Sequence, residues 1–236
     1  MEQRTLSLIV PMYNESPNLD DLVRCSVEAL ETTGLRWQLI LVDDGSTDNT
    51  HERLQALSQH EPRIVSVRHE VRLGKTAAYR TGFLQAQGDY WFTIDADLQE
   101  DLSALRAMIP LLESEYDMVV AWRRVRRDVL SKRIASRVFN TTLRWAFGSP
   151  VHDINCGFKG MKRAVGEALI PWLVRDFHRY LPLIARRMGY RVGEVVVVHR
   201  PRLHGSSRYG LERYGRALRD LWALIGAYRT GQPPPK

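Results

Sequence analysis

Two carboxylates, Asp95 and Asp97, stand two residues apart directly after a predicted strand over 90–94, a run of aromatic and β-branched residues. Acids are depleted inside strands, so both belong to the loop that leaves it. On an extended chain, the side chains of residues i and i+2 point the same way, so the two aspartates can reach one ligand. The Gln99 carbonyl, two residues further on, can reach the same ligand. Hard oxygen ligands at this density suit Mg²⁺ or Mn²⁺. The alternative is a solvated turn that caps a helix starting near Glu100.

Two more polar turns follow predicted strands. Residues 11–15 follow a strand over 6–10, and residues 43–48 follow a strand over 39–42. Strands and helices alternate along the chain, which predicts an α/β fold with a parallel sheet and right-handed crossovers. The carboxyl ends of parallel strands share one edge, where ligands bind in such sheets. We therefore expect all three polar turns to form one site.

The remaining pattern completes this sheet and its helices. Ser16 is predicted to cap a helix that has Pro17 at its first position and runs to Gly34. Further helices are predicted over 48–60, 75–87, 101–114 and 164–188 (the last broken near Pro171), and further strands over 64–67, 118–121 and 192–199. We expect one domain over 1–210, followed over 211–236 by an amphipathic helix and tail.

The composition is that of an ordinary globular protein, with 236 residues, 44% hydrophobic and 26% charged. Two cysteines are too few for a disulfide framework and fit a reduced compartment. We find neither a signal peptide nor an apolar run near 18 residues. The net charge of +7 predicts an anionic partner: nucleic acid, a phosphorylated substrate or an anionic membrane. Nucleic acid is disfavoured because no aromatic platform or recognition motif accompanies the charge.

Two common nucleotide motifs are excluded. The first turn has no G-x-G-x-x-G, which disfavours a dinucleotide cofactor. Gly74-Lys75-Thr76 imitates the end of a phosphate-binding P-loop, but His69 stands where that loop needs a glycine. Carboxylates at a sheet edge can nevertheless accept hydrogen bonds from a ribose or from the N–H edge of a base.

Four motifs in order resemble the family 2 glycosyltransferases of GT-A fold, over about residues 5–210, and most of all the dolichyl- or polyprenyl-phosphate sugar synthases. They are Pro11-x-Tyr13-Asn14-Glu15, Val42-Asp43-Asp44-Gly45-Ser46-x-Asp48, Gly74-Lys75 and Asp95-Ala96-Asp97-Leu98-Gln99. The resemblance implies a nucleotide-sugar donor bound by Pro11, Tyr13, Asn14, Glu15, Val42, Asp43, Asp44 and Lys75.

The resemblance also implies groups for the donor diphosphate. It places Asp95, Ala96 and Asp97 there, with Asp95 and Asp97 as catalytic residues and a Mg²⁺ or Mn²⁺ ion on Asp95, Asp97 and Gln99. The stretch from Arg200 to Gly210 resembles the family's R-x-x-G-x-S-K loop, so Arg202 and Arg208 would close over the diphosphate beside Arg123 as catalytic or donor-binding cations. Arg208 replaces the common lysine and keeps its charge but not its shape. Two glycines make this loop a predicted lid.

Residues 123–137 carry seven Lys or Arg against one acid. They resemble the family's basic stretch before a helix, where the acceptor lipid phosphate binds, and guanidinium groups suit phosphate oxygens. The implied acceptor-binding residues are Arg123, Lys132, Arg133, Ser136, Arg137 and, in a later loop over 153–159, Asp153. A solvated basic helix face or contact with anionic headgroups are the alternatives.

The last helix and His178 can each be interpreted in two ways. In the last helix, apolar side chains share one face, which suits either a membrane interface or packing on the domain: Leu211, Tyr214, Leu218, Leu221, Trp222 and Ile225. His178 is either catalytic or structural, and a structural role is favoured.

The resemblance implies an inverting, metal-dependent glycosyltransferase that moves a sugar from GDP-mannose or a UDP-sugar to a polyprenyl or dolichyl phosphate. A phosphate acceptor is already anionic near neutral pH and needs no strong base. We expect a cytoplasmic enzyme, peripheral at the membrane face, with no nucleic acid partner. The alternatives are a hydroxyl acceptor, for which Asp153 is the candidate base, and a non-catalytic nucleotide-binding module.

Overall fold

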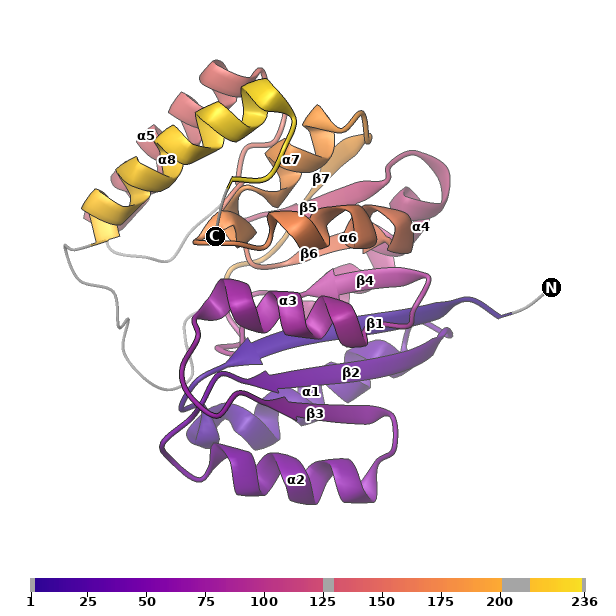
Figure 1. Ribbon diagram of the computed structural model, residues 1–236. Helices are drawn as coiled ribbons and strands as arrows, with labels where there is room; N and C mark the ends of the chain where they lie inside the picture. Colours follow the sequence, from indigo (N-terminus) through magenta and orange to yellow (C-terminus); the bar gives the residue numbers. More distant parts are fainter. Residues whose placement is uncertain (1–2, 125–129, 201–212, 235–236) are drawn as a thin grey trace.

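The computed structural model describes residues 3–124, 130–200 and 213–234, with backbone alone for 130–136 and 213–218. These residues form a seven-stranded sheet with helices on both faces (Figure 1). The strand order is β3-β2-β1-β4-β6-β5-β7. The strands are β1 (Thr5–Met12), β2 (Arg36–Asp43), β3 (Ile64–Arg68), β4 (Tyr90–Thr93), β5 (Met118–Trp122), β6 (Lys159–Lys162) and β7 (Val192–Val196).

The sheet is mostly parallel, as expected, but one strand reverses. β1 pairs in parallel with β2 and β4, β2 with β3, and β5 with β7, whereas β6 is antiparallel to β4 and β5. The alternation of strands and helices along the chain gave no sign of this reversal. Its sequence, Lys-Gly-Met-Lys, is short and lacks the β-branched residues that mark strands. Because β6 runs backwards, its first residue lies at the edge where the other central strands end.

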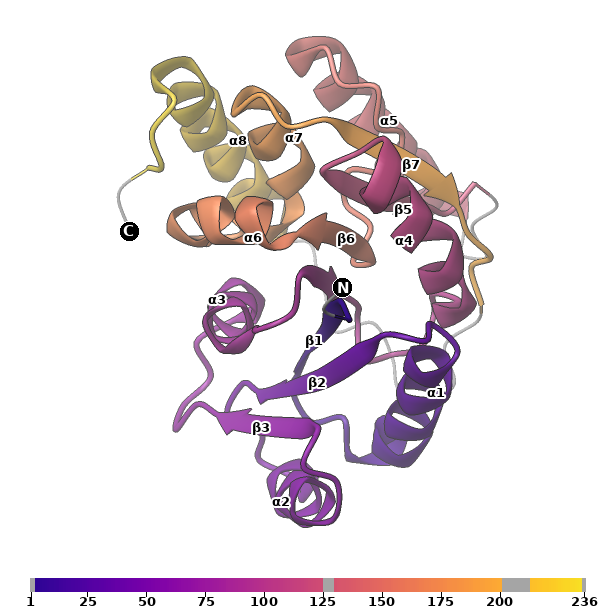
Figure 2. The same ribbon diagram turned by 90° about the vertical axis from the view of Figure 1, so that its right-hand side faces the viewer.

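The helices are α1 (Leu19–Glu31), α2 (Thr50–His60), α3 (Lys75–Gln85), α4 (Leu105–Ser114), α5 (Leu130–Phe147), α6 (Arg163–Leu169), α7 (Leu181–Arg187) and α8 (Arg213–Thr230). Five of the helices lie within a few residues of their predicted positions, whereas no range was predicted for α5, and α6 and α7 share the stretch predicted over 164–188. Short 3₁₀ turns lie at Ser16–Asn18, Leu102–Ala104, Ile170–Trp172 and Phe177–Arg179, and the third contains the helix break expected near Pro171. Figure 2 shows α1 and α4 on one face of the sheet and α3 and α6 on the other.

Three boundaries differ from the predictions. Ser16 does not cap α1; it opens a 3₁₀ turn, and its hydroxyl donates to Asn49 Oδ1 at 2.6 Å. The basic stretch over 132–137 lies within α5, not before a helix, because α5 already begins at Leu130. β7 ends at Val196, three residues before the predicted end at His199.

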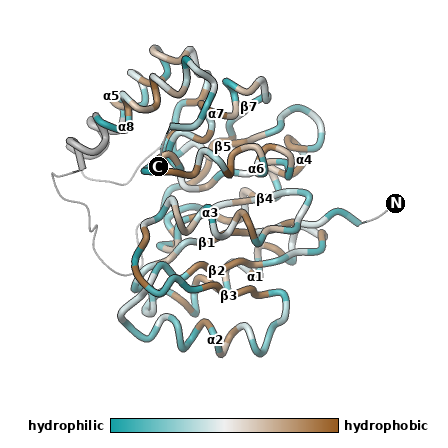
Figure 3. The backbone as a smooth tube through the Cα atoms, in the orientation of Figure 1, coloured by the Kyte–Doolittle hydropathy of each residue, from teal (hydrophilic) through white to brown (hydrophobic). Residues whose placement is uncertain are grey.

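The core lies along the central strands, where Leu8, Ile9, Val10 and residues 39–42 have no exposed surface. Figure 3 shows hydrophobic colour along β2 and β3, whereas α2 on the outside is mostly hydrophilic. α3 lies very close to β1, since a Cβ added at Gly82 would stand 2.3 Å from the Ile9 side chain. This packing fixes the N-terminus of α3 beside the ends of the strands. In the described part of the chain, no helix combines the length and the apolar character needed to cross a membrane.

Candidate active site

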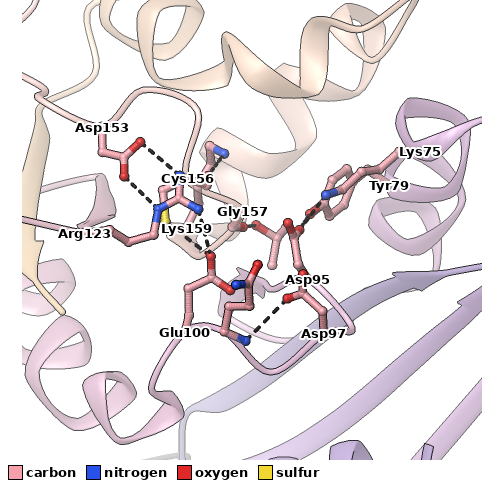
Figure 4. Close-up of polar contacts among 12 residues, drawn as sticks. Lys75, Tyr79, Asp95, Asp97, Glu100, Arg123, Asp153, Cys156, Gly157 and Lys159 are labelled. Atoms are coloured by element: carbon pink, nitrogen blue, oxygen red, sulfur yellow. Dashed lines mark hydrogen bonds and ion pairs between the residues drawn. The ribbon is translucent and has the colours of Figure 1, made fainter. Parts of the chain in front are cut away.

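The carboxyl ends of β1, β2, β4, β5 and β7 lie at one edge of the sheet, and β6 begins there. The three polar turns at 11–15, 43–48 and 95–99 therefore meet along this edge, as predicted. The reversed β6 adds residues 153–159 to the same edge, opposite the third turn. Figure 4 shows Asp95 and Asp97 of the third turn on the same side of the sheet edge as Gly157 and Lys159 of this added segment.

The first two turns interlock through Asn14. Its backbone N–H donates to Ser46 Oγ at 2.8 Å, and its side-chain oxygen accepts from the Thr47 N–H at 2.8 Å. Asn14 has a left-handed φ of 53°, which asparagine tolerates better than most residues. Pro11 and Val42 are register partners on β1 and β2, and both are buried. These two residues therefore belong to the core behind the first two turns.

Tyr13 and Glu15 are half-buried on the first turn. The Arg72 guanidinium lies 4.2 Å from the centroid of the Tyr13 ring, a cation–π contact. The Glu15 carboxylate accepts from the Asn18 side chain at 2.7 Å. An aromatic ring and a carboxylate on one turn can stack on a base and accept from its N–H or from a ribose hydroxyl.

Asp44 holds the loop that precedes α3. It is 4% exposed, and its carboxylate accepts from the backbone N–H groups of Leu73 (2.8 Å) and Gly74 (2.9 Å). His69 Nδ1 lies 2.9 Å from the same carboxylate. Asp43 is fully buried and accepts a backbone N–H within its own turn at 2.9 Å. Both aspartates are thus engaged with the protein, and they order the second turn and the loop beside it.

Asp95 is partly buried beside cationic and polar groups. Lys75 Nζ, at the first residue of α3, lies 2.6 Å from Asp95 Oδ1, and the Tyr79 hydroxyl donates to the same oxygen at 3.2 Å. Burial alone would raise the pKa of Asp95, but Lys75 outweighs burial and lowers that pKa to about 2. A Cβ at Gly157 would stand 2.3 Å from Asp95 Oδ1, so only glycine leaves room for this carboxylate.

The chain between Asp95 and Gln99 turns, contrary to the extended geometry expected there. Leu98 takes a left-handed φ of 53°, and Asp97 Oδ1 accepts from the Gln99 N–H at 3.3 Å. The Gln99 carbonyl accepts from the Arg200 N–H at 2.7 Å, which ties this turn to the segment after β7. Gln99 offers two oxygens to a cation, the second lone pair of this carbonyl and the side-chain amide oxygen.

A second charged cluster lies beside this turn. Arg123, 9% exposed at the end of β5, donates to both oxygens of Asp153 at 2.8 and 3.1 Å and to Glu100 at 3.3 Å. Figure 4 shows its guanidinium between the two carboxylates. Burial, together with the nearby charge of Asp95, raises the pKa of Glu100 to about 7. The structure thus places Arg123 and Asp153, both predicted to bind substrates, in one buried ion pair.

Sequence reasoning missed three members of this cluster: Glu100, Cys156 and Lys159. Lys159 is 3% exposed and donates to the Cys156 carbonyl, and burial lowers the pKa of its ammonium to about 8. Burial raises the pKa of the Cys156 thiol, whose sulfur lies 3.9 Å from Glu100. For Cys156 and Lys159 the signal is the loop that leads into β6, once β6 is recognised as antiparallel. For Glu100 the signal is its place directly after the third polar turn.

His178 has a structural environment. Its Nδ1 lies 2.6 Å from Thr76 Oγ1, and its ring packs 5.6 Å from Tyr79. Burial lowers the pKa of His178 well below its ordinary value, so the ring is neutral. These contacts favour the structural role over the catalytic one.

Several predicted residues lie outside the described part of the chain: Arg202, Arg208 and the side chains of Lys132, Arg133 and Ser136. Arg137, the one acceptor candidate within α5 whose side chain is described, is exposed.

The described side chains include no group of three or more His, Cys, Asp or Glu that could hold a metal ion by itself. The oxygen groups of Asp97 and Gln99, with Asp95 beside them, fit a different kind of site. Mg²⁺ and similar ions are commonly held by one or two carboxylates, with substrate phosphates and water completing the shell.

Comparison with known proteins gives the family. Residues 7–169 match the family described as Glycosyl transferase family 2. The chain is 32% identical, over 217 residues, to an undecaprenyl-phosphate 4-deoxy-4-formamido-L-arabinose transferase of Pseudomonas paraeruginosa (strain DSM 24068 / PA7), covering 92% of this chain and 63% of that protein. The same transferase of Edwardsiella ictaluri (strain 93-146) is 30% identical over 217 residues, covering 92% and 66%. The chain thus spans about two thirds of the length of these curated relatives.

Solved structures give the fold. A mannosyltransferase of Pyrobaculum calidifontis in complex with GDP-Man and Mn²⁺ superposes with a TM-score of 0.67 at 21% identity, covering 100% of this chain and 67% of that one. Glucosyl-3-phosphoglycerate synthase of Mycobacterium tuberculosis, in complex with Mn²⁺ and UDP-glucose, gives 0.64 at 21%, covering 95% and 79%. The fold is therefore GT-A, as expected. With the motifs at the sheet edge and the match over most of its length, the chain belongs to glycosyl transferase family 2.

Proposed function

We propose that this chain is an inverting glycosyltransferase that moves a sugar from a nucleotide sugar to a polyprenyl phosphate, with a Mg²⁺ or Mn²⁺ ion at the donor diphosphate. Relatives named as undecaprenyl-phosphate sugar transferases support the acceptor class. Structural neighbours crystallised with Mn²⁺ and either GDP-Man or UDP-glucose support the donor class and the ion. GDP-mannose and UDP-sugars are both candidate donors.

The interlocked turns at 11–15 and 43–48 would bind the nucleoside. Tyr13, with Arg72 against its ring, offers a surface for the base, and Glu15 offers an acceptor for a base N–H or ribose hydroxyl. Asp44 keeps the neighbouring loop in place through backbone hydrogen bonds. A wall fixed before the donor arrives loses little conformational freedom on binding.

Asp97 and Gln99 would hold the ion, and Asp95 would help to neutralise it. Such an ion stabilises the negative charge that develops on the departing nucleoside diphosphate. Lys75 lies against Asp95 at 2.6 Å, so the same corner of the site also holds a lysine ammonium for a diphosphate oxygen. Attack from the side opposite the leaving group inverts the anomeric carbon.

The observation that carries the choice of acceptor is the state of Asp153. A hydroxyl acceptor requires a base, yet Asp153 is 3% exposed and both of its oxygens accept from Arg123. A phosphate monoester has a second pKa of about 6 and is already an anionic nucleophile at neutral pH. The buried ion pair therefore supports a phosphate acceptor over a hydroxyl acceptor.

The replacement Asp153→Asn tests this proposal. With a phosphate acceptor, turnover should slow by much less than the approximately 100-fold loss that follows removal of a general base. Melting temperatures of both proteins, and turnover measured well below the lower one, separate catalysis from stability. If a folded variant turns over about 100-fold more slowly or worse, the hydroxyl acceptor is favoured instead.

A further inference from the structure

β7, the last strand of the sheet, contains one acid, Glu194, among valines. Acids are depleted inside strands, so a carboxylate at this position needs a reason. Its side chain is 12% exposed, and one of its oxygens accepts from the backbone N–H groups of two successive residues, His152 and Asp153, the second at 3.0 Å. The other oxygen lies 2.7 Å from His152 Nδ1. Glu194 therefore fixes the loop between α5 and β6 at the position of Asp153.

A stacked pair of rings holds the same loop from β5. The rings of Trp122 and His152 have centroids 4.2 Å apart and planes inclined by 11°. Val120 and Trp122 of β5 are the register partners of Glu194 and Val196 of β7. Register partners stand on the same face of a sheet, and so do alternate residues of one strand, so Trp122 and Glu194 share a face. Two neighbouring strands thus hold His152, one by a ring and the other by a carboxylate.

Asp153 transmits this constraint to Arg123. Both oxygens of Asp153 accept from Arg123, at 2.8 and 3.1 Å, and Arg123 also donates to Glu100 at 3.3 Å. Figure 4 shows that the two carboxylates reach the guanidinium from different segments of the chain. A guanidinium is planar, so a carboxylate that accepts from two of its N–H groups fixes its plane. The orientation of Arg123 therefore depends on the position of Asp153, which Glu194 sets.

We propose that Glu194 is a positioning residue for sugar transfer, because through Asp153 it orients Arg123 toward the phosphate of the acceptor. The three polar turns follow β1, β2 and β4, which are neighbours in the sheet, whereas Arg123 follows β5, beyond β6. Arg123 therefore lies beside the donor turns rather than among them, where a guanidinium can meet an acceptor phosphate. The proposal rests on the proposed function, which supplies that phosphate.

The competing role for Glu194 is purely structural. If Glu194 only stabilises the loop, its loss reduces the folded fraction and lowers turnover in the same proportion whichever substrate is varied. If it positions Arg123, its loss affects the acceptor and leaves the donor unchanged. The KM and kcat values for the two substrates therefore distinguish the two roles.

The test compares Glu194→Ala and Glu194→Gln with the unchanged chain. Sugar transfer to a short polyprenyl phosphate is measured with Mn²⁺ and either GDP-mannose or UDP-glucose, whichever the unchanged chain uses. Glu194→Ala should lower kcat/KM for the polyprenyl phosphate about tenfold, which corresponds to about one hydrogen bond lost from the transition state. The KM for the nucleotide sugar should stay within about twofold. Glu194→Gln should restore most of the loss, because an amide oxygen also accepts from two backbone N–H groups.

The matched control is Glu61→Ala at the opposite edge of the sheet. Glu61 also accepts a backbone N–H, from Arg63 at 3.0 Å, and pairs with the Arg63 guanidinium at 2.8 Å. Its replacement should leave kcat/KM for both substrates unchanged. Melting curves define the temperatures at which all the proteins are folded, and rates are compared only there. If Glu194→Ala does not fold, Glu194→Asp takes its place, since it keeps the charge but is one methylene shorter and should show the same loss toward the acceptor.

Three results would overturn the positioning role. They are an unchanged kcat/KM for the polyprenyl phosphate, an equal loss for donor and acceptor, and an equal loss in Glu194→Ala and Glu194→Gln, which would assign the effect to charge. Calorimetric titration with the polyprenyl phosphate separates this proposal from the proposed function. If the unchanged chain binds the phosphate but transfers no sugar, the proposed function fails. About tenfold weaker binding by Glu194→Ala then supports the positioning role, and equal binding rejects it. If the unchanged chain neither transfers sugar nor binds the phosphate, both proposals are rejected.

Discussion

The two edges of the sheet hold carboxylates in different electrostatic settings. At the amino edge, Asp89 accepts from the Thr5 N–H at 2.8 Å, and Asp117 accepts from the Arg191 N–H at 2.9 Å and from Lys162 at 2.9 Å. These acids join the starts of neighbouring strands and stay in contact with water. At the carboxyl edge, Asp153 and Glu100 are almost fully enclosed and face a buried guanidinium.

The difference shows which acids serve the fold alone. Backbone donors and partial hydration stabilise a carboxylate at little cost, and the pKa of Asp89 and Asp117 is lowered accordingly. Buried ion pairs, in contrast, often contribute little net stability, because desolvation offsets their attraction. The buried cluster of Arg123, Asp153 and Glu100 is therefore not explained by stability alone.

A cavity at the amino edge is lined by guanidinium groups that already bond to the protein. Its volume is about 940 Å³, and its lining includes Arg4, Arg63 and Arg163. Arg63 bonds to Glu61 at 2.8 Å, Arg163 to the Gly88 carbonyl at 3.0 Å, and Arg4 to Tyr90. The chemistry of the carboxyl edge, rather than the volume of the hollow, identifies the site.

The largest difference between the edges should appear in activity. Asp97→Ala should slow turnover about 100- to 1,000-fold, because charge on the departing diphosphate loses its stabilisation. Asp117→Ala, the matched change at the amino edge, should leave turnover within about twofold when both proteins are folded, since surface changes away from the site rarely alter chemistry. Initial rates at saturating Mn²⁺ measure both. Near-normal turnover in Asp97→Ala would contradict the proposal that Asp97 holds an ion at the donor diphosphate.

The next effect is on stability. Arg123→Met should lower the free energy of unfolding by about 3–5 kcal/mol, because it leaves Asp153 and Glu100 buried without their cation. Urea unfolding measures this free energy. The control is the double variant Arg123→Met, Asp153→Asn, which should be more stable than Arg123→Met alone. If the single variant is as stable as the unchanged protein, water must reach these carboxylates and the cluster is not enclosed.

A smaller effect is expected at Asp44. Asp44→Asn replaces a charged acceptor of two backbone N–H groups and should cost about 1.5–3 kcal/mol of stability. The KM for the donor should also rise, because the loop before α3 loses its anchor. Asp48→Asn is the matched control: its carboxylate accepts from the Thr50 N–H, and asparagine serves equally well in such a position. Equal behaviour of the two variants would contradict the anchoring role of Asp44.

The smallest effect is that of Asp117→Asn on stability, about 1 kcal/mol at neutral pH after allowance for solvent. Asp117 has a folded-state pKa below its ordinary value of 3.8, so its contribution is complete above pH 3.8 and is lost as the pH falls through the lower folded value. Unfolding curves of the two proteins should therefore converge in acid. A gap that persists or widens there would contradict this assignment.

Much of the fold could be predicted because periodicity and turn residues agree along the first half of the chain. The polar turns after β1, β2 and β4 then had to meet at one edge. Sequence spacing could not show that β6 reverses, since a four-residue strand with two lysines has no pattern of its own. Without that reversal, Asp153 and Lys159 could not be placed beside Asp95. Nor could spacing show that Arg123 would turn to Asp153, because ion pairs between distant segments depend on tertiary packing.

The central claim is that the carboxyl edge transfers a sugar to an acceptor that is already charged. The direct test offers the chain one nucleotide sugar, Mn²⁺, and either a short polyprenyl phosphate or the corresponding polyprenol, and measures the glycosylated lipid formed from each. We predict product from the phosphate alone, with inverted configuration at the anomeric carbon. Equal transfer to the free alcohol, or a retained configuration, would contradict the account.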